Sequence, residues 1–341
     1  MKVIDVEDAV GTVLCHDITR IIPGQSKGPG FRRGHVVRPE DIAELRKIGK
    51  EHLYVFDLAD GYVHEDDAAR RIASAAAGSG LRLSDPEEGK ITFTAAMDGV
   101  VEIDAERLLS INSLGDILFA TVHGNQLAAR GRKLAGVRVL PLAVPESLIR
   151  EAEQLLEASG PIIRVRSLKP QRVGIVVTGS EVYNGLIEDK FGPVVRDKFR
   201  SYGSTIIGKR LVSDDQTMTA RAIRDFLDDG AEFIVVTGGM SVDPDDCTPA
   251  AIRATGAEVV NYGAPIFPGA MFMLARVGNV PVLGLPGCVM YYRASIFDIV
   301  VPRLLCGLDV TRDDILSLGY GGFCEGCTTC RYPTCGFGKG A

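Results

Sequence analysis

The segment Thr237–Ile252 has the residue types and the spacing of a ligand-binding loop. The apolar run Phe233–Val236 predicts a buried strand, and two glycines that would let a ligand approach the backbone follow it. A helix is then expected to begin at Thr248 and Pro249, with Thr248 as its cap and with its free amides turned toward an anion. The loop also contains three carboxylates, which would repel a bare phosphate and are typical ligands of a bridging Mg²⁺: Asp243, Asp245 and Asp246. We therefore predict a site for a phosphorylated compound that is held partly through a metal ion.

Three other polar loops follow predicted strands of the same region. Val173–Val177 leads into Thr-Gly-Ser-Glu at 178–181, Ser204–Leu211 leads into Ser-Asp-Asp at 213–215, and a third strand leads into Leu-Pro-Gly at 285–287. Taken singly, a glycine pair is more often a tight turn, and an aspartate pair before a helix is usually a cap. In a doubly wound sheet, however, ligands bind at the carboxyl ends of the strands, where all these loops would lie. Their joint order is therefore a stronger signal than any one of them.

The segments between these loops alternate between strand and helix patterns. This alternation predicts a parallel, doubly wound, three-layer α/β/α domain. Besides the strands named above, we expect helices over Phe191–Tyr202, Thr217–Leu227, Pro249–Ala254 and Tyr291–Leu305, a strand over Glu258–Tyr262, and short strands on either side of Gly278 and Asn279.

Taken in order, these motifs resemble the molybdopterin-binding domain shared by molybdopterin adenylyltransferases, molybdopterin molybdenumtransferases and gephyrin. The resemblance covers roughly residues 171–305. It implies that the two-glycine loop and the helix after it hold the phosphate end of the pterin. It also implies phosphoryl chemistry with Mg²⁺: one branch of the family adenylylates the phosphate of molybdopterin, and the other removes the adenylyl group while molybdate is placed on the dithiolene.

The resemblance also assigns roles to positions of this chain. Asp214 and Asp246 are expected to bind the divalent ion or to orient a water or an oxyanion, and Glu181 is expected to orient ligand or metal. The family further implies a homodimer. The residues expected to bind the cofactor are Thr178, Gly179, Ser180, Thr237, Gly238, Gly239, Met240, Ser241, Pro286 and Gly287.

Two positions depart from the molybdenumtransferase pattern. Those enzymes usually carry a lysine in a Pro-Gly-Lys-Pro stretch, whereas this chain has Ala270 there. Cys288 follows the Leu-Pro-Gly loop where Asn or Ser is usual, and a buried thiol is its plain interpretation. The missing cation predicts lowered activity, its replacement by Lys209 or Arg210, or binding without catalysis.

Three functions fit the sequence. The first is Mg-dependent phosphoryl or adenylyl chemistry on molybdopterin or its adenylylated form, coupled to molybdate insertion. The second is a non-catalytic molybdopterin carrier or a maturation chaperone for a client molybdoenzyme, which the missing lysine favours. The third is a nucleotide-handling hydrolase of the competence-damage type, which would act on free nucleotides.

The eight cysteines divide into two groups. Four are scattered along the chain and are interpreted as reduced thiols. The other four follow the pattern C-x2-C-x2-C-x4-C in a glycine-rich tail: Cys324, Cys327, Cys330 and Cys335. Thiolates spaced so closely predict a tetrahedral Zn²⁺ site or an iron–sulfur cluster. A thiol relay, and a docking tail that orders only with a partner, are the alternatives.

The composition limits the classes of protein to which the chain can belong. A chain of 341 residues with 46% hydrophobic and 24% charged residues predicts a globular protein of two or three domains. Its net charge of −6 argues against nucleic acid as a partner. It has no apolar run of about 18 residues and no signal-peptide pattern at its start, so we expect a cytoplasmic protein that does not contact membranes.

We expect the chain to be organised in five segments. The five segments are an N-terminal α+β region at 1–80, a small β-barrel or sandwich-like domain at 81–145, a helix and linker at 146–170, the molybdopterin-binding domain at 171–310 and the cysteine-rich tail at 311–341.

Within the first segment, the glycine-rich stretch Pro23–His35 carries Arg33. It is expected either to bind an anion or to form a solvated loop.

Overall fold

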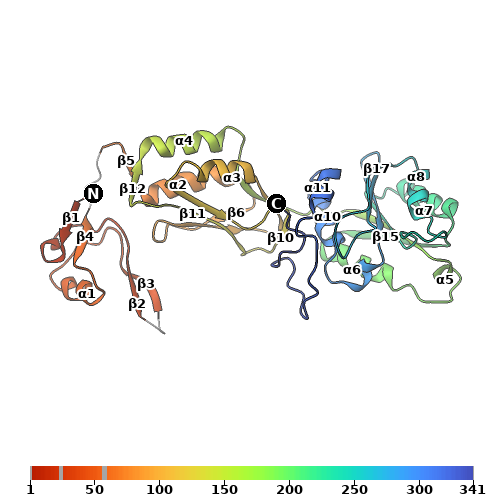
Figure 1. Cartoon of the computed structure of the whole chain (residues 1–341), viewed down its shortest axis with the longest axis horizontal. Coiled ribbons are helices and arrows are strands. Elements are labelled where there is room, and N and C mark those ends of the chain that lie inside the picture. Colours follow the sequence, from red (N-terminus) through yellow and green to blue (C-terminus); the bar gives the residue numbers. More distant parts are fainter. Residues whose placement is uncertain (1, 23–25, 56–59, 341) are drawn as a thin grey trace. The chain divides into compact units, whose positions relative to one another are not determined.

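The computed structural model of the chain describes residues 2–22, 26–55 and 60–340, which form two compact units (Figure 1). The predicted α/β class is confirmed. The predicted division into five segments is finer than this and stays a prediction. Within the described part of the chain, no helix is long and apolar enough to span a membrane. Unit 1 comprises Met1–Met97, Glu102–Val122 and Ala129–Val165, and unit 2 comprises Asp98–Val101, His123–Ala128 and Arg166–Ala341.

A six-stranded sheet with the order β15-β14-β16-β19-β18-β17 forms the centre of unit 2. The first four strands are parallel neighbours, whereas β18 is antiparallel to both β19 and β17. The prediction of a parallel sheet is therefore wrong for β18, because the short turn at Gly278 joins it to β19 as a hairpin. The strands are β14 (Arg172–Thr178), β15 (Thr205–Val212), β16 (Phe233–Thr237), β17 (Glu258–Tyr262), β18 (Met273–Val277) and β19 (Val280–Leu285).

Helices cover both faces of this sheet and make the three layers (Figure 1). Val173 and Ile175 of β14 belong to the core under α6 and α10, and Val176 belongs to the opposite core under α7 and α8. Because side chains alternate across a strand, both faces must be apolar, which explains the continuous apolar runs of the sequence. The helices are α5 (Ser180–Tyr183), α6 (Phe191–Ser201), α7 (Gln216–Asp228), α8 (Thr248–Ala254), α9 (Cys288–Tyr291), α10 (Ile296–Leu305) and α11 (Arg312–Ser317).

Two details of the predicted helices are wrong. The helix expected over Tyr291–Leu305 is interrupted between α9 and α10, because Ser295 and Asp298 form a capping box that starts a new helix. Thr248 is the first residue of α8 and not its cap, which is Cys247. The hydroxyl of Thr248 instead donates to the carbonyl of Gly238 at 2.8 Å.

Unit 1 consists of antiparallel strand pairs and helices. Its four-stranded sheet β6-β7-β11-β9 packs against α2, which also packs against α4. The sequence analysis did not predict α3, whose cap Asp104 accepts a hydrogen bond from the backbone N–H of Arg107 at 3.0 Å. The strands are β1 (Lys2–Asp5), β2 (Ile18–Ile22), β3 (Ser26–Phe31), β4 (His52–Val55), β5 (Tyr62–His64), β6 (Leu81–Leu83), β7 (Ile91–Ala95), β9 (Ile117–Thr121), β11 (Lys133–Val139) and β12 (Ala143–Pro145). The helices are η1 (Val6–Ala9), α1 (Asp41–Lys47), α2 (Glu65–Ala76), α3 (Ala105–Asn112) and α4 (Glu146–Glu157).

The glycine-rich stretch 23–35 is only partly a loop. Ser26–Phe31 forms β3 and pairs with β2, while residues 23–25 lie outside the described residues. The guanidinium of Arg33 donates to the carboxylate of Asp66 at 2.7 Å. Anion binding by this stretch stays a prediction, and the Arg33 cation already has a carboxylate partner.

Candidate functional site

The four polar loops lie side by side at one edge of the unit 2 sheet. Because β15, β14, β16 and β19 are parallel neighbours, their carboxyl ends share this edge. In the observed register, Thr178 is opposite Val212, and Thr237 is opposite Leu285. The Ser-Asp-Asp, Thr-Gly-Ser-Glu, Thr-Gly-Gly and Leu-Pro-Gly loops are therefore adjacent, as the sequence predicts.

The two aspartates of the Ser-Asp-Asp loop have different roles. Asp215 caps α7 by accepting a hydrogen bond from the backbone N–H of Met218 at 2.7 Å. Asp214 accepts one from the backbone N–H of Ser180 at 2.8 Å, and the hydroxyls of Ser180 and Ser213 lie 2.9 Å apart. Asp214 thus joins its own loop to the Thr-Gly-Ser-Glu loop, which holds its carboxylate in a defined position.

The Thr-Gly-Gly loop is held by close packing against β14. Gly238 has φ +89°, and a Cβ at this position would lie 2.5 Å from the carbonyl oxygen of Thr178. Thr178 Oγ1 donates to the carbonyl of Thr237 at 3.1 Å. The backbone N–H of Thr248 donates to the carbonyl of Gly239 at 3.1 Å. The first amide of α8 is therefore already used, and the predicted cradle of free helix amides is wrong for this position.

The remaining predicted residues of this loop differ in exposure. Met240 is only 4% exposed and packs against Gly284 in the core, so its side chain does not face solvent. Ser241 and Asp245 are exposed, whereas Asp246 is half-buried. On the neighbouring loop, Glu181 is exposed in α5. Among the acidic residues of the Thr-Gly-Gly loop, Asp246 is therefore the one that the fold partly encloses.

Asp214 and Asp246 come from different loops and influence the same thiol. Burial and the negative charges of Asp214, Asp215 and Asp246 raise the pKa of the Cys247 thiol. This shared influence places both predicted catalytic carboxylates near Cys247. Cys247 was expected to be only a reduced thiol, and Ser213 was expected only as a member of the Ser-Asp-Asp loop. Their positions directly beside Asp246 and Asp214 are the signal that could have identified them.

The part of the chain that contains these loops matches a known protein family. Residues 174–305 match a family described as a probable molybdopterin binding domain. The resemblance predicted for residues 171–305 is thereby confirmed. Residues 3–57 match a second family, described as a domain of unknown function (DUF8806).

Individual relatives match different lengths of the chain. The molybdopterin molybdenumtransferase of Bacillus subtilis (strain 168) is 25% identical over 300 residues, which cover 82% of this chain and 64% of that protein. A CinA-like protein of Mycobacterium sp. (strain MCS) is 32% identical over 90 residues, which cover 26% of this chain and 21% of that protein. The chain thus spans less than two thirds of the length of either relative.

Among solved structures, the molybdopterin biosynthesis enzyme MoaB from Thermus thermophilus is similar at 20% identity. The match covers 40% of this chain and 97% of that chain, with a TM-score of 0.33. Because this score is low, the fold of the molybdopterin-binding domain rests on its own strand order and layers.

The Pro-Gly-Ala loop of the molybdopterin-binding domain contains no replacement for the missing lysine. Gly269 packs against α10, where a Cβ would lie 2.7 Å from Ile296, and Ala270 follows it. The two cations considered as replacements lie on β15, and both have carboxylate partners from other segments. Lys209 lies 2.7 Å from a carboxylate oxygen of Asp189. Arg210 pairs with two carboxylates, those of Asp225 and Asp229.

The Leu-Pro-Gly loop of the domain leads directly into α9. Pro286 is buried, whereas Gly287 is exposed and a Cβ on it would meet no atom within 4 Å. Cys288 is half-buried, and burial raises the pKa of its thiol. Its surroundings agree with the plain interpretation of a packed thiol.

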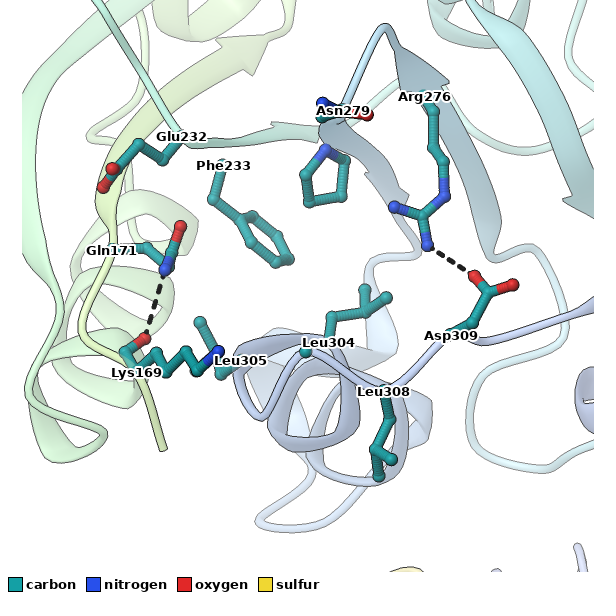
Figure 2. Close-up of a pocket in the computed structure, with 12 residues that line it drawn as sticks. Lys169, Gln171, Glu232, Phe233, Arg276, Asn279, Leu304, Leu305, Leu308 and Asp309 are labelled. Carbon is teal, nitrogen blue, oxygen red and sulfur yellow. Dashed lines mark hydrogen bonds and ion pairs between the residues drawn. The ribbon is translucent and has the colours of Figure 1, made fainter. Parts of the chain in front are cut away.

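A separate pocket of about 330 Å³ lies at the opposite edge of the sheet (Figure 2). Its lining includes Gln171 and Phe233, at the amino ends of β14 and β16, and Leu305 at the end of α10. Figure 2 shows Arg276 turned toward Asp309, and these two side chains are 2.9 Å apart. Because the motif loops lie at the carboxyl edge, this pocket is not part of the candidate site.

The donor groups of the site fit Mg²⁺ in chemical type. Within residues 2–22, 26–55 and 60–340, no group of three or more His, Cys, Asp or Glu side chains is arranged to hold a metal ion. Mg²⁺ does not require such a group, since it usually binds one or two carboxylates, substrate phosphates and water. Asp214 and Asp246 could supply those carboxylates. The metal centre expected at the four tail cysteines stays a prediction.

Proposed function

We propose that this protein binds molybdopterin or its adenylylated form at the carboxyl edge of the unit 2 sheet and acts on the phosphate end of the ligand. The proposal rests on the positions of Asp214 and Asp246, which lie on loops at this one edge of the sheet. After burial, the charges of both are among the causes that raise the pKa of the Cys247 thiol. Both residues lie within the part of the chain that matches the molybdopterin-binding domain family. Carboxylates near a phosphate are expected to act through a divalent cation, because they would otherwise repel the ligand.

The proposed reaction is removal of the adenylyl group with release of AMP, coupled to molybdate insertion. Bound Mg²⁺ would supply charge neutralisation during phosphoryl transfer. Asp214 is suited to hold such an ion because one of its oxygens is fixed by Ser180, and its other oxygen makes no hydrogen bond to the described residues. Asp246 would be the second carboxylate, and Glu181, exposed on the adjoining helix, would orient ligand or metal. We further propose a cytoplasmic homodimer, as the family resemblance implies.

A non-catalytic molybdopterin carrier, or a maturation chaperone for a client molybdoenzyme, is the second candidate. Ala270 favours it, because the cation usual in molybdenumtransferases is missing there. Lys209 and Arg210 of β15 are each paired with a carboxylate from another segment, so neither supports the view that a nearby cation compensates. A carrier would bind the pterin through the same loops and release no AMP.

A nucleotide hydrolase is the third candidate. The similarity of 90 residues to a CinA-like protein favours it. This candidate predicts release of phosphate or nucleoside monophosphate from free nucleotides, and no affinity for molybdopterin.

One experiment separates the three candidates. The purified protein is titrated anaerobically with molybdopterin and with adenylylated molybdopterin, and binding is followed by pterin fluorescence. AMP release is then measured with Mg²⁺ and molybdate. We expect binding of at least one pterin form together with AMP release. Binding without release would assign the carrier function, and failure to bind either pterin would overturn the proposal.

A further inference from the structure

The cysteine-rich tail is a packed part of unit 2. The backbone N–H of Phe267 donates to the carbonyl of Gly322, and that of Cys324 donates to the carbonyl of Phe267, each at 2.8 Å. Further along the tail, Phe337 is only 5% exposed and belongs to the core that contains the α10 side chains. The described residues that follow α11 form no helix or strand. The tail is thus held by a few anchors rather than by regular structure of its own.

All four cysteines of the tail line one pocket of about 380 Å³. The pocket lies between the tail and the segment Tyr291–Ala294, which joins α9 to α10. Two guanidinium side chains also line it, those of Arg293 and Arg331, and neither has an ion-pair partner among the described residues. The tail is fixed beside the pocket by Tyr332, whose hydroxyl donates to the carbonyl of Asp298 at 2.8 Å.

We propose that this pocket holds a thiophilic metal centre, either a Zn²⁺ ion or an iron–sulfur cluster, bound by the thiolates of Cys324, Cys327, Cys330 and Cys335. The proposal does not depend on the function proposed for the sheet edge, because metal content is measured without any pterin. Zn²⁺ and iron–sulfur clusters share the same ligand chemistry, namely four thiolates from closely spaced cysteines.

The state of the thiols supports this proposal. None of the four cysteines is in a disulfide; three are half-buried and Cys327 is exposed. Although they line one pocket, they are not yet arranged as a metal-ligand set within the described residues. The four lie within residues 324–335 and line the same pocket, so the tail would have to rearrange to bring the sulfurs onto one centre. The binding free energy would then stabilise a tail that has little apolar surface of its own.

The charged residues that line the pocket also support a metal centre bound by thiolates. Four thiolates around one Zn²⁺ carry a net charge of about −2. The lining residues described for the pocket include no carboxylate and include the guanidinium groups of Arg293 and Arg331. These two cations are placed to offset the charge of a thiolate centre. A pocket built only to pack apolar thiols would not need unpaired cations at its wall.

The test is metal analysis of the full chain. The protein is purified anaerobically, stripped of metal, and incubated either with Zn²⁺ alone or with Fe²⁺ and sulfide. We expect either about one zinc per chain, or about four iron and four sulfide with a visible absorption band. The incubation in which the protein takes up metal identifies the centre as zinc or as an iron–sulfur cluster. A chain that takes up neither would overturn the proposal.

Two further measurements assign the metal to the tail. Simultaneous replacement of all four tail cysteines by serine leaves Tyr332 and Phe337 in place and is expected to reduce metal content at least about tenfold. The matched control is Cys306→Ala, which removes a buried thiol that does not line the pocket and should leave metal content unchanged. In the wild-type protein, bound metal should also protect the four tail thiols from alkylation, as mapped by mass spectrometry. Metal retained by the quadruple variant, or tail thiols that are alkylated equally with and without metal, would contradict the proposal.

Discussion

The two units use their charged residues in different ways. In unit 2, four neighbouring strands run in parallel, so four polar loops begin at one edge of the sheet. In unit 1, the strands named above pair antiparallel, so successive loops leave from opposite edges. Parallel strands therefore gather loop residues that are far apart in the sequence, and antiparallel strands distribute them.

The charges of unit 1 mostly stabilise its framework. Arg71 of α2 donates to carboxylate oxygens of Glu146 and Glu153 on α4 at 2.8 and 2.6 Å. Arg107 donates to the backbone carbonyls of Leu156 and Gly160, at the end of the same helix. These interactions join elements of the fold. In unit 2, by contrast, Asp214 and Asp246 lie on loops at one edge of the sheet without a cation partner among the described residues.

The largest expected effect is that of Asp246→Asn in unit 2. The amide keeps the size of the side chain but removes the charge that would hold a divalent ion. We expect a loss of AMP release of about 100-fold or more, while pterin binding is retained. Turnover of adenylylated molybdopterin and pterin fluorescence measure the two effects. The control is Asp228→Asn, which changes an exposed carboxylate at the end of α7 outside the motif loops and should leave turnover nearly unchanged. Full activity of Asp246→Asn would show that this carboxylate is not needed for turnover, and unit 2 would then not differ from unit 1 in using its charges for function.

The next effect is that of Gly238→Ala, which tests the packing of the Thr-Gly-Gly loop. The new Cβ would lie 2.5 Å from the carbonyl oxygen of Thr178, so the loop must move. We expect a loss of about 2 kcal/mol in unfolding free energy, together with weaker pterin binding. The matched control is Gly256→Ala, at φ +85° with no atom within 4 Å of the new Cβ. It tests backbone strain alone and should cost about 1 kcal/mol without changing pterin binding. Equal effects of both variants on binding would argue against a positioned loop.

The variant Ala270→Lys is expected to have a smaller effect of opposite sign, an increase in AMP release. This variant restores a cation at the position where molybdenumtransferases usually have one. If the protein is an enzyme with a weakened anion site, AMP release should rise about tenfold, which corresponds to about 1.4 kcal/mol. Ala270→Met supplies a side chain of similar length without the charge and serves as the control. No gain from the lysine, in a protein that binds the pterin, would favour the carrier function.

The smallest expected effect concerns the stability of unit 1. Burial, followed by the charge of Asp66, raises the pKa of Glu65 from 4.5 to about 7. The folded state therefore binds the proton more tightly than the unfolded state, so stability falls as the pH rises from about 4.5 to 7, and the full cost is present above 7. Glu65→Gln removes this titration but also weakens the contact with Arg138, so we expect a net gain of about 1 kcal/mol at pH 8 and little change at pH 5.

Chemical denaturation at the two pH values measures the effect of Glu65→Gln. The comparison of the units also predicts that this variant leaves pterin binding unchanged. A variant that is no more stable at pH 8 than the wild type would contradict the assigned cost of burying the carboxylate. A change in pterin binding would show that unit 1 contributes charge to ligand recognition.

Much of the α/β domain was predictable because its strands are buried on both faces. The strand predicted over Val173–Val177 is observed as Arg172–Thr178, and the helix predicted over Thr217–Leu227 as Gln216–Asp228. Such apolar runs and caps depend on residues that are close in the sequence. The helix α3 was missed because its Asp104 cap lies within a region dominated by strand patterns. The direction of β18 was predicted wrongly, because a parallel sheet was expected and the turn at Gly278 joins β18 to β19 as a hairpin.

The residues of the candidate site could be predicted from the sequence, but many of their contacts could not. The acidic and glycine residues could be identified from their order along the chain. The hydrogen bonds of Thr248 could not, because its hydroxyl bonds to Gly238, ten residues earlier, instead of capping its own helix. The pairing of Lys209 with Asp189 was equally hidden, since the two residues lie on different elements.

The residues at the strand ends and the spacing of the tail cysteines could be read from the chain alone, because both are properties of neighbouring positions. The tertiary structure was needed to show that the charges of Asp214 and Asp246 both act on the Cys247 thiol and that the four tail thiols line one pocket. The physical reason is strand order: contacts between distant segments follow from which strands pair in the sheet and which surfaces pack against it.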